Sequence, residues 1–354
     1  MSNNIGIPLD VLHAFGYYDN FSVTQNGDGL INTTFFIKAG KTKTVLQKIN
    51  RGVFKNAEAI QSNYVKVYNY IEQHAPDFVM PKPMVACICD SFFIDSQGDF
   101  WRGFYYVANS SVKHFITDAK EAYTVAALFG RLLKTLDGFP VEQLQETIPQ
   151  FHNLHLRYQQ FTSAVKNCDK KRKLKAALLI EELKKRQKYV SLYDEVVKQK
   201  EKFPLRVLHH DAKIANILFD KKSGKVLCAV DFDTLMPGYF FSDFGDLVRA
   251  SACSVREEET DLSKVFINRE YFEALLKGYV DETQEILTEG ERTLLIYSGH
   301  LLIYMQCLRF ITDYLLGDIY YKTSYPNHNF NRAMNQLTLL ESLEKLVPES
   351  MLIT

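Results

Sequence analysis

Hydrophobic and polar positions alternate in the first hundred residues with the period of β-strands. The stretch NGDGLINTTFFIKAG predicts a Gly-rich turn, a strand to about Ile37 and a second turn at Ala39-Gly40. The next stretch, KTVLQKIN, predicts the strand that pairs with it. A further hairpin is predicted by VACICDSFFID and FWRGFYYVA, which the polar SQGD separates. The N-terminal part is therefore expected to be rich in β-structure.

Helical spacing marks one segment of this part and most of the remaining chain. Apolar residues recur about every 3.6 positions at Ala57, Ile60, Tyr64, Val67 and Ile71, which predicts a helix. After about Asn109 helical patterns dominate, and strand signals return only within residues 205–233. We therefore predict an α+β chain of two lobes, a β-rich N-terminal lobe over residues 1–109 and a mostly helical C-terminal lobe over residues 110–354.

A lysine-rich segment, residues 170–202, invites comparison with a nucleic-acid-binding patch. Its apolar residues, such as Ala176, Leu179 and Leu183, form a stripe, and acidic residues interleave with the lysines. This pattern favours the solvated face of an amphipathic helix. The whole chain has 42 basic and 42 acidic residues, so it offers no general electrostatic reason to expect a nucleic-acid or membrane partner.

The cellular compartment is predicted from the N-terminus, the longest apolar run and the cysteines. The stretch MSNNIGIPLD shows no signal peptide, and the apolar run from Leu294 to Leu308 is too short and polar to span a bilayer, so we expect a buried core helix there. Six scattered cysteines, including Cys87 and Cys89, lack the spacing of a zinc site. Free thiols and a cytoplasmic location are the expectation.

Candidate chemistry concentrates in the stretch VLHHDAKIANILFDKKSGKVLCAVDFD, residues 207–233. Asp211 follows a short apolar run, and Asn216 comes five residues later. Two further apolar runs around a Gly turn predict a hairpin, and its second strand leads to Asp231. Asp211, Asn216 and Asp231 are therefore expected to converge.

Phosphoryl transfer needs such a set of side chains. A carboxylate such as Asp211 can orient the acceptor hydroxyl and accept its proton. Asn216 and Asp231 offer the oxygen ligands that Mg²⁺ prefers, and Lys213 can reach the γ-phosphate of the nucleotide. The spacing H-x-D-x-K-x-x-N, followed by a hairpin and D-F-x, matches the catalytic and metal loops of kinases.

Other polar residues near this loop are expected to have supporting roles. A metal site made of His209, His210 and Asp211 is disfavoured, because neighbouring side chains of an extended loop diverge. His209 is expected to brace the loop by hydrogen bonds. The stretch SDFGDLVR predicts the start of a helix, with Asp243 buried and holding backbone N–H groups. Asp233 is expected to hold the metal-binding residues in position without binding the metal itself.

Five motifs in order carry a family resemblance: NGDGLINTTF, ETIPQFHN, HHDAKIANILFD, DFDTLMPGYFFSDFGDLVR and RFITDYLLGDIYY. Over residues 26–329 the chain resembles the aminoglycoside phosphotransferase and choline kinase superfamily, and within it the bacterial N-acetylhexosamine 1-kinases. The resemblance implies a protein-kinase-like fold and phosphorylation by ATP and Mg²⁺ of the anomeric hydroxyl of N-acetylglucosamine or N-acetylgalactosamine. It assigns the general base to Asp211, the metal ligands to Asn216 and Asp231, and sugar contacts to Arg309 and Tyr320.

The residues around Arg309 agree with a polar pocket but leave one alternative open. Arg309 follows a helix that is apolar nearly all round, where a guanidinium is costly unless it is paired or faces a polar cavity. Asp313, one turn on, could be a buried partner for it. Gly317 is expected to end this helix, so that the following loop can present Tyr320.

Two positions depart from the relatives or from the kinase pattern. The strand KTVLQKIN carries Gln47 where a phosphate-binding lysine is expected, and Lys48 points to the other face. Leu30 replaces a histidine that contacts the sugar in the relatives, so the identity of the sugar stays open. The nucleotide is then expected to be held by backbone N–H groups and hydroxyls of the Gly-rich region. These candidates are Gly27, Gly29, Asn32, Thr33, Thr34 and Gln47.

The leading hypothesis is an ATP- and Mg²⁺-dependent sugar 1-kinase in which Asp211 and Lys213 are catalytic. One alternative is another small-molecule kinase of the superfamily, for choline, homoserine, methylthioribose or an aminoglycoside. A nucleotide-binding pseudokinase is the alternative that Gln47 favours, and the intact set of Asp211, Asn216 and Asp231 argues against it.

Overall fold

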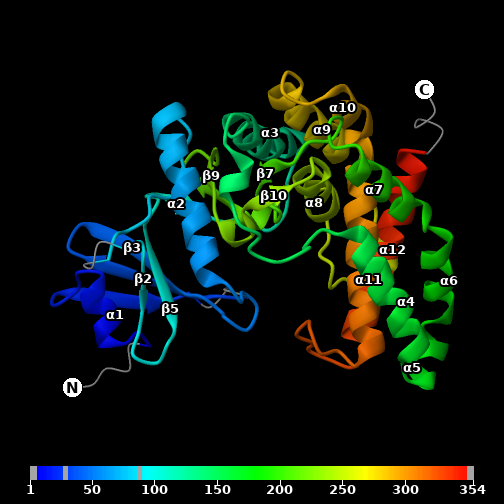
Figure 1. Cartoon of the computed structure of the whole chain (residues 1–354), viewed down its shortest axis with the longest axis horizontal. Helices are drawn as coiled ribbons and strands as arrows, with labels where there is room; N and C mark the ends of the chain where they lie inside the picture. Colours follow the sequence, from blue (N-terminus) through cyan, green and yellow to red (C-terminus); the bar gives the residue numbers. More distant parts are fainter. Residues whose placement is uncertain (1–5, 27–30, 87–89, 349–354) are drawn as a thin grey trace. The chain divides into compact units, whose positions relative to one another are not determined.

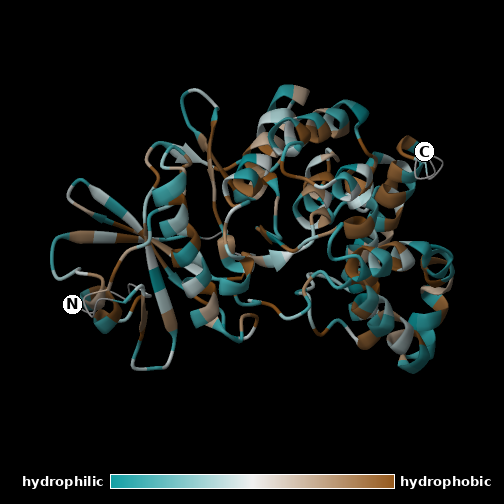
Figure 2. Cartoon of the chain, turned by 45° about the horizontal axis from the view of Figure 1, so that its top comes forward, coloured by the Kyte–Doolittle hydropathy of each residue, from teal (hydrophilic) through white to brown (hydrophobic). Residues whose placement is uncertain are grey.

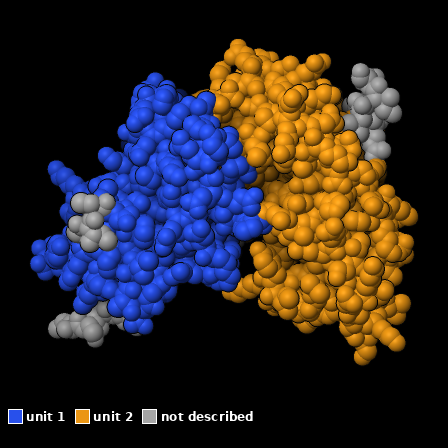
Figure 3. All heavy atoms as spheres, in the orientation of Figure 1, with its two compact units in different colours: residues 1–111, 138–149, 218–237 blue, residues 112–137, 150–217, 238–354 orange. Residues whose placement is uncertain are grey.

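The computed structural model describes residues 6–26, 31–86 and 90–348. The chain forms two compact units (Figure 3). The first contains residues 1–111, 138–149 and 218–237, and the second contains residues 112–137, 150–217 and 238–354. The single boundary near residue 109 stays a prediction, and two later segments of the chain belong to the first unit.

An antiparallel five-stranded sheet, in the order β1-β2-β3-β5-β4, forms the centre of the first unit. Its strands are β1 (Phe21–Gln25), β2 (Thr33–Ala39), β3 (Thr42–Lys48), β4 (Phe92–Ile94) and β5 (Phe100–Tyr105). Both predicted hairpins, β2–β3 and β4–β5, are present, and Gly40 turns the first of them with a φ of +58°. Cys87 and Cys89 lie outside the described residues, and Val85 and Ala86 before them are not in a strand.

The register of the sheet separates a polar row from an apolar face. Thr34 pairs with Gln47, and Gln47 pairs with Arg102, so these side chains neighbour one another on one face. On the other face Trp101 packs with helix α1 (Leu9–Ala14). Helix α2 (Ala57–His74), which the apolar spacing predicts, covers the face that carries Arg102, with Ile60 in a core that includes Phe100 (Figure 1).

A second, smaller sheet of the first unit carries the predicted hairpin that precedes Asp231. Its order is β6 (Ser110–Ser111), β8 (Ile217–Asp220) and β9 (Val226–Ala229), with Gly224 in the turn at a φ of +68°. Asp231 follows in the left-handed region, at a φ of +65°, directly before the 3₁₀ turn η3 (Phe232–Thr234). Phe232 packs edge-on against Tyr64 of α2, with ring centroids 5.7 Å apart, so this turn is fixed to the helix.

The second unit is almost entirely helical. Its helices are α3 (Ala119–Thr135), α4 (Leu154–Asn167), α5 (Lys170–Lys175), α6 (Ala177–Lys185), α7 (Lys188–Lys198), α8 (Phe241–Ser251), α9 (Arg269–Thr283), α10 (Glu289–Leu294), α11 (Ser298–Leu316) and α12 (His328–Leu346). The short strand β7 (Arg206–Leu208) precedes the loop that carries Asp211, whereas β10 (Met236–Gly238) begins in the last segment of the first unit. Helix α11 packs against α4, α8 and α12, and most of its residues are buried. The hydropathy colouring of Figure 2 shows brown, hydrophobic stretches on several helices of the chain.

The lysine-rich segment forms α5, α6 and α7 in place of the single helix that its pattern predicts. One straight helix over these residues would be roughly 50 Å long, well beyond the width of a small domain. The breaks after Lys175 and Lys185 keep Ala176, Leu179 and Leu183 buried. The charged residues do form a solvated face, where Lys184 and Lys185 pair with glutamates three positions earlier.

Helices α3 and α9 approach each other closely at two glycines. A Cβ atom on Gly278 of α9 would lie 2.2 Å from the backbone oxygen of Tyr123 in α3. A Cβ atom on Gly130 of α3 would lie 3.0 Å from the backbone oxygen of Tyr279 in α9. Each helix therefore has a glycine at the point where it contacts the backbone of the other helix.

Within the described residues, one helical stretch, Glu289–Leu316, is long and apolar enough to cross a membrane. Of its most apolar window, 78% is buried inside the protein, as in the core helix of a soluble protein. The buried core helix predicted over Leu294–Leu308 is thus confirmed. Four cysteines of the described chain are free thiols, Cys168, Cys228, Cys253 and Cys307.

Candidate active site

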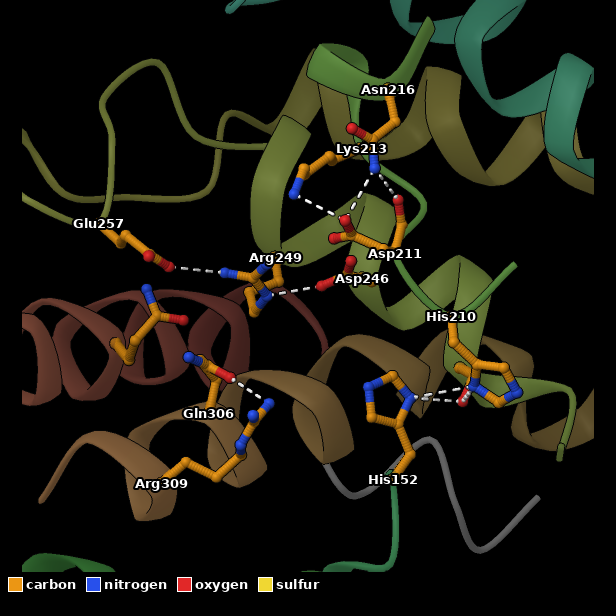
Figure 4. A network of polar contacts seen from close by, with 12 residues as sticks. His152, His210, Asp211, Lys213, Asn216, Asp246, Arg249, Glu257, Gln306 and Arg309 are labelled. Carbon is orange, nitrogen blue, oxygen red and sulfur yellow. Dashed lines mark hydrogen bonds and ion pairs between the residues drawn. The ribbon is translucent and has the colours of Figure 1, made fainter. Parts of the chain in front are cut away.

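The loop after β7 brings Asp211, Lys213 and Asn216 together (Figure 4). The Asp211 Oδ2 atom accepts hydrogen bonds from Lys213 Nζ and Asn216 Nδ2, both at 2.8 Å. Asn216 Nδ2 also donates to the backbone oxygen of Asp211 at 2.9 Å and ends the 3₁₀ turn η2 (Ile214–Asn216). Three predicted site residues thus form one hydrogen-bonded group within six positions.

The surroundings of Asp211 favour its ionised form. Burial would raise the pKa of this carboxyl, but the charge and hydrogen bond of Lys213 outweigh burial, and His209 and Asn216 add to their effect. The net result is a pKa below the usual 3.8. Asp211 is therefore a carboxylate at neutral pH, which is the form that can accept a proton.

Asp243, in the first turn of α8, fixes the backbone of this loop. Its carboxylate accepts the N–H of His209 at 3.0 Å and the N–H of His210 at 2.7 Å. His210 has a φ of +63°, a conformation that is strained for a residue with a side chain. The role expected for Asp243, holding backbone N–H groups, is what the structure shows.

His209 braces the loop, as its position in the sequence indicates. Its Nδ1 atom accepts the backbone N–H of Asp211 at 3.3 Å. Its ring stands edge-on to Phe129 of α3, with centroids 5.5 Å apart. His209 is fully buried and lies at the base of the loop.

His152, in the motif ETIPQFHN, joins this group although no sequence pattern assigns it a role. Its Nδ1 atom lies 2.7 Å from Ser242 Oγ, and the Nδ1 atom of His210 lies 3.0 Å from the same hydroxyl (Figure 4). Burial, and then the nearby His210, lower the pKa of His152 well below 6.5, so the ring is neutral. Because 58 positions separate the two histidines, only the fold reveals the contact.

A second buried carboxylate near Asp211 is neutralised by an arginine. Asp246 accepts a hydrogen bond from Arg249 Nε at 2.7 Å, and Arg249 also binds Glu257 at 3.0 Å. Burial raises the pKa of Asp246, and the charge of Asp211 raises it further. Arg249 therefore allows two carboxylates to lie near each other, a role that no motif in the sequence indicates.

Arg309 lies in the C-terminal half of α11, between aromatic rings. Its guanidinium lies 5.2 Å from the ring centre of Phe151 and 5.5 Å from that of Tyr321, and it donates to Gln306 Oε1 at 3.1 Å. No carboxylate of the described residues lies within 4 Å of it, so the alternative ion pair with Asp313 does not form.

Asp313 instead orders the turn that follows α11. It accepts the backbone N–H groups of Ile319, Tyr320 and Tyr321 at 2.8–3.0 Å. Gly317 ends the helix with a φ of +104°, as predicted. Tyr320 is 62% exposed and packs edge-on against Tyr321, which is the ring that contacts Arg309.

A second arginine adds positive charge near Arg309. Burial, and then the charge of Arg309, lower the pKa of Arg157 to about 10. Arg157 donates to the backbone oxygens of Gln150 and Phe151 at 3.1 and 3.0 Å, which holds the turn that carries Phe151. Two guanidinium groups and the rings of Phe151 and Tyr321 thus lie near one another beside the C-terminal half of α11.

The first unit holds the residues predicted to bind the nucleotide. Gln47 Nε2 donates to Thr34 Oγ1 at 3.1 Å. Thr33 pairs with Lys48 in the register, one position away from Thr34, and Lys48 forms an ion pair with Asp99. Gly27, Gly29 and Leu30 lie outside the described residues. Asn32 accepts the backbone N–H of Asn50 at 2.9 Å.

The predicted metal ligands provide suitable oxygen atoms. Both hydrogen bonds of Asn216 use its Nδ2 atom, which leaves Oδ1 as the ligand atom of that side chain. The described residues contain no group of three or more His, Cys, Asp or Glu side chains that could hold a metal. Mg²⁺ usually takes only one or two protein carboxylate or amide ligands beside phosphate oxygens and water, so the two residues fit it. Asp231 belongs to the first unit, and its convergence with Asn216 stays a prediction.

The family follows from comparison with known proteins. The sequence profile of the phosphotransferase enzyme family, APH, matches residues 22–279, which is more than half of the chain. The chain belongs to this family. Its members are phosphotransferases, so the coarse prediction of a small-molecule kinase of the aminoglycoside phosphotransferase and choline kinase superfamily is confirmed.

Solved structures show the same fold at low sequence identity. The amicoumacin kinase hAmiN, solved in complex with AMP-PNP, Ca²⁺ and Ami, has a TM-score of 0.60 at 14% identity, and the match covers 92% of this chain and 89% of that chain. A microcompartment-associated aminopropanol kinase has a TM-score of 0.61 at 14% identity, with 97% of both chains covered. An aminoglycoside phosphotransferase from Alicyclobacillus acidocaldarius has a TM-score of 0.62 at 12% identity, with 96% of both covered.

These similarities confirm the predicted fold class, a protein-kinase-like α+β fold with a β-rich N-terminal part and a helical C-terminal part. The expected use of ATP and Mg²⁺ agrees with membership of the phosphotransferase family.

Proposed function

We propose that the protein transfers the γ-phosphoryl group of ATP to a hydroxyl of a small neutral acceptor, namely the anomeric hydroxyl of an N-acetylhexosamine. The observation that carries the reaction type is the ionised Asp211, held by Lys213 and Asn216 in a loop that Asp243 fixes. This geometry supplies a positioned base and nearby positive charge, which are the protein's share of phosphoryl transfer.

In this proposal Asp211 orients the acceptor hydroxyl and takes its proton as the new oxygen–phosphorus bond forms. Lys213, whose Nζ atom lies 2.8 Å from Asp211 Oδ2, steadies the negative charge on the transferred group. Asn216 and Asp231 would hold Mg²⁺, which when bound neutralises the phosphate oxygens. The contact with Lys213 favours the ionised form of Asp211 before the substrates bind.

The acceptor class is inferred from the charge and rings around Arg309. Hydroxyl and amide groups of a sugar can accept hydrogen bonds from Arg309, and the apolar face of a sugar ring can pack on Tyr320 or Tyr321. A cationic acceptor such as choline or an aminoglycoside would meet Arg309 and Arg157, with no carboxylate of the described residues within 4 Å of Arg309. This surrounding favours a neutral sugar over the cationic alternatives.

An ADP-release screen tests the proposed acceptor directly. With ATP and Mg²⁺ we expect the fastest turnover on N-acetylglucosamine or N-acetylgalactosamine, compared with other sugars, choline, homoserine, methylthioribose and aminoglycosides. The Asp211→Asn protein serves as the control for contaminating kinases. Turnover confined to choline or homoserine would overturn the sugar assignment, and ADP binding without transfer to any acceptor would favour a pseudokinase.

Substitution of Arg309 tests the acceptor pocket. Arg309→Ala is expected to raise KM for the sugar at least tenfold and leave KM for ATP within twofold, because the contacts of the guanidinium, Phe151, Tyr321 and Gln306, all belong to the proposed acceptor site. Arg309→Lys should recover little, since an ammonium group cannot reproduce the planar contacts with Phe151 and Tyr321. Arg269→Ala, at an exposed position on α9, is the matched control. An unchanged KM for the sugar in the Arg309→Ala protein would show that Arg309 does not bind the acceptor.

A further inference from the structure

A buried polar chain crosses the first unit, from the start of β2 to the turn that follows Asp231. Asp233 and Arg102 form an ion pair in which the two residues are only 3% and 2% exposed. The other oxygen of Asp233 accepts a hydrogen bond from the side chain of Asn32. Asp233 is thus held on both sides and is engaged by protein groups.

The guanidinium of Arg102 continues the chain to β3. Its Nε and Nη2 atoms donate to Gln47 Oε1 at 3.1 and 2.8 Å, and Gln47 in turn donates to Thr34. The third nitrogen, Nη1, is buried and has no hydrogen-bond partner among the described residues. The ring of Phe104, 5.1 Å away, lies against the same guanidinium.

The pair of Arg102 and Asp233 is comparable to an ion pair of protein kinases. In protein kinases a lysine of the third strand pairs with a glutamate of the following helix, and this pair must be in place for phosphoryl transfer. Here the third strand carries Gln47, and the positive charge comes from Arg102 at the paired position of β5. The negative charge comes from Asp233, which lies two residues after Asp231.

A buried ion pair needs a reason beyond stability. Apolar residues of similar volume often stabilise a protein equally well or better than a buried pair, because desolvation of two charges is costly. What the pair adds is a defined geometry. Through Arg102, Asp233 connects the turn after Asp231 to the sheet. Through its other oxygen it also holds Asn32, which comes two residues after the Gly-rich segment 27–30.

We propose that Arg102 and Asp233 are positioning residues of the nucleotide site: as a relocated ion pair, they hold Asp231 and Asn32 where Mg²⁺ and the phosphates bind. The inference rests on the proposed function to the extent that Asp231 is a metal ligand. Arg102 lies in the sheet, so the pair holds the turn that follows Asp231 directly to the sheet. Helix α2 lies wholly within the described residues, and none of its acidic residues takes part in this pair, unlike the glutamate of the helix in protein kinases.

The test measures ADP binding by calorimetry, with and without Mg²⁺, so that it does not depend on the acceptor. In Arg102→Gln and Asp233→Asn we expect the gain in ADP affinity that Mg²⁺ provides to fall at least tenfold. The double variant Gln47→Lys with Arg102→Gln returns a cation to the third strand, and we expect it to recover at least a third of the lost gain. KM for the acceptor should stay within twofold in all three variants.

Two controls separate positioning from a general loss of stability. Arg186→Gln breaks an ion pair with Glu344 in the second unit, and it should lower the melting temperature without changing the effect of Mg²⁺ on ADP binding. Trp101, the single tryptophan, packs on the opposite face of β5, so its fluorescence reports whether the sheet of each variant is folded.

Each outcome decides the inference. A folded Arg102→Gln or Asp233→Asn protein with an unchanged Mg²⁺ effect would show a merely structural pair and overturn it. If Arg102→Gln does not fold, Asp233→Asn, which removes the other charge of the pair, decides under the same criterion. A wild-type protein that binds Mg²⁺ and ADP but phosphorylates no acceptor would remove the proposed function and leave this test intact, whereas no ADP binding at all would overturn both.

Discussion

Replacement of Asp211 by asparagine is expected to lower turnover on the order of 10²–10⁴-fold and to leave the fold intact. An amide cannot accept the proton of the acceptor hydroxyl. It has nearly the same shape as the carboxylate and keeps one oxygen that can accept the hydrogen bonds of Lys213 or Asn216. The measurements are kcat with the best acceptor and circular dichroism for the fold.

The effect of pH sharpens this prediction. Because the pKa of Asp211 is depressed in the folded protein, its carboxylate stays ionised above the usual 3.8, and the stability that its contacts contribute is lost only as pH falls through the lower folded value. An acid limb of kcat/KM between pH 5 and 7 is therefore not expected from Asp211. Turnover of the Asp211→Asn protein near that of the wild type would remove Asp211 as the base.

Asp243→Ala is expected to destabilise the protein by about 3–5 kcal/mol and to abolish measurable turnover. The change leaves the N–H groups of His209 and His210 without their acceptor in buried surroundings, at about 1–3 kcal/mol each. It also releases His210 from its strained conformation, and Asp211 is the next residue in the chain. Urea unfolding followed by circular dichroism gives the loss of stability.

Asp243→Asn provides the graded comparison. Its amide keeps one acceptor oxygen but turns an N–H₂ group toward the other backbone N–H, so we expect an intermediate loss of stability. If the alanine variant unfolds at the same urea concentration as the wild type and phosphorylates the acceptor at the same rate, the loop does not depend on Asp243.

Local patterns predicted the elements and the centre of the site. The strands around Gly40 and the helix from Ala57 follow from periodicity within short windows, and the fold has them at those places. Asp211, Lys213 and Asn216 were predictable as a group because they lie within six positions of one loop. Their separation is so short that the loop conformation alone brings them together.

Contacts between distant segments were not predictable in the same way. The bonds of Arg102 to Gln47 and Asp233, and of His152 to Ser242, join residues 55 to 131 positions apart, and no periodic pattern encodes such pairs. The lysine-rich segment forms three helices, and its apolar periodicity does not mark the breaks after Lys175 and Lys185. The sequence likewise does not show whether Asp313 pairs with Arg309 or accepts the N–H groups of the next turn, because that depends on the backbone geometry after α11.

The glycines where α3 and α9 cross have a consequence for variation in this protein. Phe129, beside Gly130 in α3, is the ring against which His209 packs. A shift of α3 at the helix crossing would therefore also shift the loop that carries His209 and Asp211. A methyl group at Gly278 has no room beside Tyr123 and would displace α3. Random mutagenesis scored by growth or turnover would therefore report Gly278 as essential, and a map of essential positions drawn without the structure would mistake this helix crossing for part of the substrate site.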